Sequence, residues 1–168
     1  IINFIKMKKI LTICLIIISF STLAQEITTK KGKVIYDDKE VALIDKKKKV
    51  FTISTLDNTS SYNFVKSDEK LANGVFAILY EVTNNKTNEK NHLIFTKPKR
   101  SLSGEKVLAE NIALSYGFIT PEGLDVEKIN SFLIGEKINP EEKIKEINTQ
   151  INQHIKDCKA KFKAKNFV

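Results

Sequence analysis

Residues Gly74–Thr83 read GVFAILYEVT and form a nearly continuous apolar run that is rich in β-branched and aromatic side chains. Such a run predicts a β-strand, and because both alternating faces are apolar, it predicts a central strand that is buried on both sides. The polar segment Asn84–Lys90 predicts a turn, and His92–Thr96 predicts the next strand. We therefore expect the inner part of a sheet near the middle of the chain.

Shorter β-rich segments precede this run and are separated by charged or turn-forming residues. Val41 and Leu43 are expected to share one face of the second of these strands. The spacing of about ten residues between segments predicts an antiparallel meander. The expected strands are Lys33–Tyr36, 41–45, Val50–Thr55 and Tyr62–Lys66. The expected core of the curled sheet consists of Phe51, Ile53, Phe76, Ile78, Tyr80, Leu93 and Phe95.

Helical periodicity replaces the strand pattern in the second half of the chain. Apolar residues recur at helical spacing over Gly104–Tyr116, and Gly117 is suited to cap that helix in the left-handed conformation. Asp125 is a suitable N-cap for a second helix over Val126–Ile134. These signals predict two short helices after the sheet.

A third helix has the clearest start signal in the chain, because Asn139 is suited to the N-cap and Pro140 to the first helical position. We expect it to run to about Ala164. Its apolar residues recur every 3.6 residues or so, the period of a straight helix. This stripe is a candidate contact surface, either for its own domain or for a partner protein. Its members are Ile144, Ile147, Ile151, Ile155, Cys158 and Phe162.

The predicted fold class is α+β. We expect an antiparallel meander of five or six strands, followed by two short helices and one long C-terminal helix. In domain terms, residues 25–138 form the α+β domain and residues 139–168 form the amphipathic C-terminal helix.

The N-terminal segment has the pattern of a secretory signal peptide. Met7 is the expected start of translation, Lys8 and Lys9 are positively charged, and Ile10–Phe20 is mostly apolar. Small residues precede Gln25, so residues 1–24 are expected to be an over-extended start plus a signal peptide. The mature protein would then begin near Gln25, contain no transmembrane segment, and be exported to the periplasm or the medium.

The chain is basic, with 28 Lys and Arg residues against 20 Asp and Glu residues. Arg100 is the single arginine and tryptophan is absent, which disfavours specific nucleic-acid binding, since arginine is the preferred residue for bidentate phosphate recognition. Two basic clusters could contact an anionic polymer or lipid if the fold brings them together, or could be two separate solvated connections. Their members are Lys46, Lys47, Lys48, Lys49, Lys97, Lys99 and Arg100.

No residue pattern predicts a catalytic, cofactor-binding or metal site. His92, His154 and Cys158 do not have the number or spacing of zinc ligands. Cys158 is expected to be a buried thiol on the apolar side of its helix. A hydrolase with dispersed acidic residues remains an alternative. Its pocket would be lined by carboxylates such as Asp37, Asp38, Glu40 or Glu81.

Three segments carry a resemblance to a known group of proteins: Leu23–Gln25, Gly32–Leu56 and Asn111–Gly135. In these three segments the chain resembles small, functionally uncharacterised exported bacterial proteins that have a signal peptide, a β-meander and a helical C-terminal tail. The resemblance implies export and one α+β domain, and it implies no activity.

The leading functional hypothesis is a non-enzymatic secreted or periplasmic interaction protein of the cell envelope, with an envelope protein as partner. The absence of a catalytic motif and the long helix with one apolar edge favour it. The alternatives are a protein that binds anionic surface polymer or lipid through its lysines, and the hydrolase described above.

Overall fold

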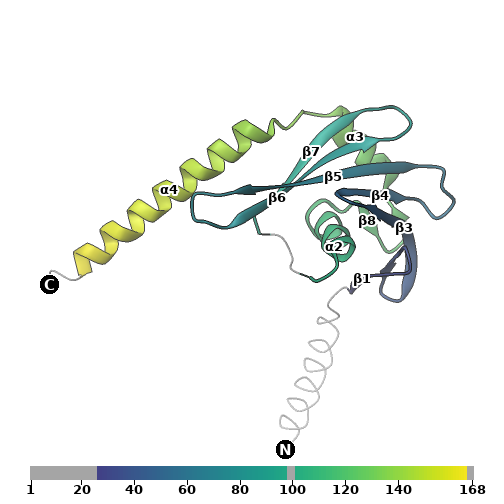
Figure 1. The fold of residues 1–168 in the computed structure, drawn as a ribbon, viewed down its shortest axis with the longest axis horizontal. Helices are drawn as coiled ribbons and strands as arrows, with labels where there is room; N and C mark the ends of the chain where they lie inside the picture. Colours follow the sequence, from purple (N-terminus) through teal and green to yellow (C-terminus); the bar gives the residue numbers. More distant parts are fainter. Residues whose placement is uncertain (1–25, 98–100, 166–168) are drawn as a thin grey trace, which may run out of the picture.

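The computed structural model describes residues 26–97 and 101–165. In this part the chain forms a seven-stranded sheet, a two-stranded ribbon and three helices (Figure 1). The sheet consists of β1 (Ile27–Lys30), β2 (Lys33–Tyr36), β3 (Lys39–Lys47), β4 (Val50–Ser54), β5 (Ser61–Lys70), β6 (Phe76–Asn84) and β7 (Lys90–Phe95). The remaining elements are α2 (Gly104–Tyr116), β8 (Ile119–Thr120), β9 (Gly123–Leu124), α3 (Val126–Ile134) and α4 (Pro140–Lys165).

Each strand of the large sheet pairs antiparallel with its neighbours in sequence, so the predicted meander and the α+β class are confirmed. The strand number is seven rather than the expected five or six. The additional strand is β1, whose four residues pair from Ile27 opposite Tyr36 to Lys30 opposite Lys33. Its sequence, ITTK, is too short to show a period of its own, and its hairpin partner holds it in place.

The apolar strand β6 is covered on both faces, as its sequence predicts, but it is not central. It lies sixth in the sheet, next to the edge strand β7. Tyr80 and Val82 point into the main core, whereas Ala77 and Leu79 belong to a second, smaller core. Phe76, an expected core residue, is instead 56% exposed, because β6 begins beyond the end of the helix that covers that face.

A β-bulge changes which residues of β3 face the core. Ala42 pairs with Val34 and Glu40 with Ile35, so Val41 is the extra residue between them. Val41, Ala42 and Ile44 are all buried in the main core, whereas Leu43 is only partly buried and lies outside it, so the expectation that Val41 and Leu43 share one face is wrong. Strict alternation fails here because one inserted residue reverses the faces of those that follow it.

The main core lies between the concave face of the sheet and the short helices α2 and α3 (Figure 1). Leu108 and Ile112 of α2, and Ile129 and Leu133 of α3, are fully buried against it. The predicted caps are confirmed: Gly117 ends α2 with a φ of 61°, and the Asp125 side chain accepts a hydrogen bond at the start of α3.

Asn91 on β7 joins the sheet to the connection between α3 and α4. Its side-chain Nδ2 donates to the carbonyl oxygens of Phe132 (2.8 Å) and Glu136 (2.9 Å). Its Oδ1 accepts from the backbone N–H of Ile138 at 2.9 Å. These bonds satisfy backbone groups that have no partner in a helix or strand, and they set the point from which α4 departs.

The long helix α4 crosses the opposite face of the sheet from α2 (Figure 1). Ile144, Ile147 and Ile151 pack against the second core, which consists of Leu71, Ala77 and Leu79. The first half of the apolar stripe therefore docks on its own domain, one of the two alternatives left open by the sequence. The second half extends past the sheet, so Cys158 is exposed and the expectation that its thiol is buried is wrong.

Candidate functional site

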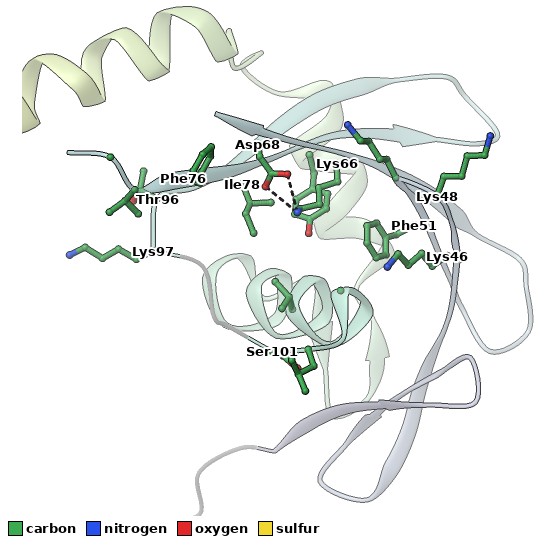
Figure 2. Close-up of a pocket in the computed structure, with 17 residues that line it drawn as sticks. Lys46, Lys48, Phe51, Lys66, Asp68, Phe76, Ile78, Thr96, Lys97 and Ser101 are labelled. Carbon is green, nitrogen blue, oxygen red and sulfur yellow. Dashed lines mark hydrogen bonds and ion pairs between the residues drawn. The ribbon is translucent and has the colours of Figure 1, made fainter. Parts of the chain in front are cut away.

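An open groove of about 1060 Å³ lies between the concave face of β4–β7 and the N-terminal end of α2. Figure 2 shows the sheet on one side, carrying Ile78 and Asp68, and α2 on the other. Phe51 and Lys46 lie at one end, and Phe76, Thr96 and Lys97 lie at the other.

The groove exists because the end of the β5–β6 hairpin extends past the N-terminal end of α2, the helix that packs on this face of the sheet. α2 begins only at Gly104, so on the face of the sheet opposite α4 no described helix covers the hairpin end. At Gly104 a Cβ atom would lie 3.2 Å from the Cζ atom of Phe51 and 3.3 Å from the Nζ atom of Lys46. The absence of a side chain therefore lets the helix start approach the sheet closely at the inner end of the groove.

The floor of the groove is apolar. Phe51, Tyr80 and Val107 are buried and form its deepest part, and the partly buried Ile78 continues it outward. Tyr80 packs edge to face against Phe51, with ring centroids 6.0 Å apart, so the floor is a fixed aromatic surface. The mouth is also apolar and more exposed, with side chains from Val75, Phe76 and Leu102.

The rim of the groove is basic. Asp68 is the one carboxylate among its described lining residues, and it forms an ion pair with Lys66 at 3.0 Å. Lys46 Nζ lies 5.5 Å from the centroid of the Phe51 ring, within the range of a cation–π contact. The lysines that line the groove are Lys46, Lys48, Lys49, Lys66 and Lys97. The cavity therefore combines an apolar floor with a positive rim.

Two shifts of pKa agree with this arrangement. Burial, together with the nearby Asp68 charge, raises the pKa of the Tyr80 hydroxyl well above its usual value, so the floor is neutral at physiological pH. The pKa of Glu105, on the first turn of α2, is lowered by a hydrogen bond from its own backbone N–H, and also by Ser103 and the Lys46 charge. Lys46 is therefore close enough to stabilise an anion at this end of the groove.

Members of both basic clusters predicted from the sequence line this groove, at its opposite ends (Figure 2). Lys46, Lys48 and Lys49 from the β3–β4 hairpin line it together with Lys97 after β7. Lys47 is not among its lining residues, and residues 99 and 100, which complete the second cluster, lie outside the described residues.

Sequence reasoning missed Lys66 and the apolar mouth of the groove. The sequence pattern places Lys66 on a strand face with Tyr62 and Phe64, and that alternation could have indicated a charge at the border of the core. The sequence pattern also assigns Phe76 to the core. An apolar residue within an apolar strand has the same pattern whether or not a helix covers it in the fold.

The acidic residues considered for a hydrolase do not meet at one site. Asp37 and Asp38 form the turn between β2 and β3, and Glu40 follows them in β3. Glu81 lies on the α4 side of the sheet. Glu81 is 3.0 Å from Lys90 in a solvent-exposed ion pair and lines a smaller depression at the start of α4. Within residues 26–97 and 101–165, no group of three or more His, Cys, Asp or Glu residues could hold a metal ion.

Comparison of the chain with protein-family models, with curated proteins and with solved structures found no match. Among the helices of the described part, none combines the length and the apolar character needed to cross a membrane. In the groove, an apolar surface and a concentration of positive charge coincide.

Proposed function

We propose that this protein is a non-enzymatic binding protein that holds an amphiphilic anion in the lysine-rimmed groove. The apolar part of the ligand lies on Phe51, Ile78 and Tyr80, and its anionic group lies among the rim lysines. The observation that supports this function is the juxtaposition of an apolar floor and a basic rim in a cavity of about 1060 Å³. Cavities of roughly 300–1000 Å³ accommodate small organic ligands in many proteins.

The apolar floor supplies the main driving force for binding. Each methylene group removed from water contributes about 0.8 kcal/mol, so a chain of several carbons offsets the entropy lost on association. The exposed mouth residues Val75 and Phe76 extend the apolar surface outward, which suits a ligand with a linear chain.

The lysine rim selects for negative charge. Ammonium groups are hydrated point charges on flexible stems, so they suit an anionic group without requiring one fixed geometry. The interaction is partly exposed to solvent and is therefore screened by salt, with a Debye length of about 10 Å at 0.1 M. Affinity is expected to fall as ionic strength rises, but the apolar contribution persists.

The N-terminal segment supports the same class of function. If residues 1–24 are a signal peptide, the protein carries this groove outside the cytoplasm, as expected for an exported binding protein of the cell envelope. Anionic lipids and free fatty acids have the required combination of an apolar chain and a negative group.

The test is a fluorescence titration with a dansylated long-chain fatty acid, followed by displacement with unlabelled oleate. We expect saturable one-site binding that oleate reverses and that oleyl alcohol, which lacks the charge, reverses much less. Replacing Lys46, Lys48 and Lys49 with Gln should weaken binding about tenfold, and Phe76→Ser should weaken it about three- to tenfold. A matched control replaces the exposed Lys30, Lys31 and Lys86 with Gln and should leave binding unchanged.

Two results would contradict the proposal. One is equal loss of affinity in the rim variant and in the charge-matched control, which would mean that net charge alone governs binding. The other is displacement of the probe by polyphosphate as effectively as by oleate, which would indicate an anionic-polymer site that does not use the apolar floor.

A further inference from the structure

The C-terminal half of α4 forms a second surface that is separate from the groove. α4 contains 26 residues, and the members of its stripe that pack against the second core are Ile144, Ile147 and Ile151. Figure 1 shows that the helix continues beyond the β5–β6 hairpin, so the body of the domain does not cover its end. We call residues 152–165 the distal segment of α4.

The distal segment is amphipathic and strongly basic. Ile155 is half-buried, whereas Phe162, on the same stripe, is 70% exposed. Lys156, Lys159 and Lys161 are exposed beside this stripe. In sequence, positions 156–165 contain five lysines and a single acidic residue. A basic helix with one exposed apolar edge is typical of segments that lie in a membrane interface.

We propose that the distal segment of α4 lies on the surface of an anionic lipid bilayer, with Phe162 inserted at the level of the head groups and the flanking lysines paired with lipid phosphates. Charge complementarity identifies this occupant, because two copies of the segment would place like charges against each other. This inference does not depend on the proposed function of the groove.

The docking geometry follows from how α4 is anchored. Asn148 Oδ1 accepts a hydrogen bond of 2.8 Å from the backbone N–H of Ala72, at the turn of the β5–β6 hairpin. The three isoleucines that precede the distal segment are held in the second core. A bilayer contact through the distal segment would therefore hold the whole domain at the membrane surface rather than only a flexible tail.

The experiment is co-sedimentation of the full chain with large vesicles, made either from equal parts of phosphatidylglycerol and phosphatidylcholine or from phosphatidylcholine alone. We expect binding to the anionic vesicles only, and its loss when NaCl rises from about 0.05 M to about 0.5 M. Phe162→Ser should lower the partition coefficient about tenfold, since burial of its ring is lost. Replacing Lys156, Lys159 and Lys161 with Gln should abolish the preference for anionic vesicles.

Matched controls distinguish binding through the distal segment from nonspecific apolar adhesion and from binding through the groove. Leu56→Ser removes another exposed apolar side chain, in the turn between β4 and β5, and should leave vesicle binding unchanged. Phe76→Ser, which alters the groove, should also leave it unchanged, so failure of the groove proposal and failure of this one give different results. Because Phe162 is exposed, its replacement should not change the melting temperature.

Three results would overturn the proposal. The first is equal binding to neutral and anionic vesicles. The second is equal loss of binding in the Leu56→Ser control. The third is a dimer in analytical ultracentrifugation that Phe162→Ser dissociates, which would assign the stripe to a second copy of the chain.

Discussion

Asp57 organises the turn between β4 and β5 at the scale of a single residue. Its Oδ1 accepts hydrogen bonds from Thr55 Oγ1 at 2.6 Å, from Thr59 Oγ1 at 2.8 Å and from the Thr59 backbone N–H at 3.1 Å. The hydrogen bond from the Thr55 side chain, followed by those from Thr59, lowers the pKa of Asp57 from 3.8 to about 2. The turn therefore favours the ionised carboxylate.

This shift predicts how stability depends on pH. Because the folded-state pKa is depressed, the contribution of Asp57 is fully present above pH 4 or so and is lost as the pH falls toward 2. Asp57→Asn keeps an acceptor but does not titrate, so its melting temperature should be lower than that of the wild type at neutral pH. The difference should shrink between about pH 4 and pH 2, as measured by thermal denaturation followed by circular dichroism. Parallel curves for the two proteins over this range would refute the assignment.

At the scale of an element, α4 contains two halves with the same sequence pattern and different surroundings. Ile147 packs against the second core, whereas Ile155, on the same apolar stripe, lies two turns further along the helix and is not among the residues packed against that core. The helix is thus held by its first half, and hydrogen exchange should be slow there and fast toward Lys165.

The paired substitutions Ile147→Ala and Ile155→Ala test this division. Replacing a fully buried isoleucine with alanine lowers the free energy of unfolding by about 2–5 kcal/mol. Because Ile147 is only half-buried, we expect its replacement to lower this free energy by about 1–2 kcal/mol. Hydrogen exchange over residues 144–151 should accelerate about tenfold or more in Ile147→Ala. The Ile155→Ala control should change it little. If both variants behave alike, α4 does not dock in the way described.

At the scale of the whole molecule, the two cores lie on opposite faces of one sheet. The main core contains side chains from the sheet, from α2, α3 and from the β8–β9 ribbon, and no described residue of α4 belongs to it. The second core is small, and α4 is its cover. The groove opens on the face of the main core, away from α4.

A shortened chain that ends at Asn139 should therefore remain folded. It keeps the bonds of Asn91 to the α3–α4 connection but loses the cover of Leu71, Ala77 and Leu79 and the hydrogen bond from Ala72 to Asn148, so we expect a loss of about 2–4 kcal/mol. Circular dichroism should show the sheet retained, and urea denaturation should give the loss of stability. An unfolded product would show that α4 contributes to the main core as well.

Local patterns in the sequence were sufficient for the type and the order of most elements. The caps at Gly117, Asp125 and Asn139, and the helical spacing between them, correctly predicted α2, α3 and the start of α4. Alternation predicted the meander, and five of the seven residues expected in its core are buried there. These signals succeed because each depends on the backbone conformation and hydrogen bonding of a few consecutive residues.

The tertiary structure decided what depends on segments far apart in the chain. It added β1 to the sheet, shifted the faces of β3 through one bulge, and left Phe76 and Cys158 exposed. It also brought Lys46 and Lys97 to one groove. From the sequence, a shared surface for the two basic clusters was only one of two alternatives. The physical reason is that apolar side chains have the same local pattern whether or not another element covers them, so burial depends on how far each helix extends over the sheet.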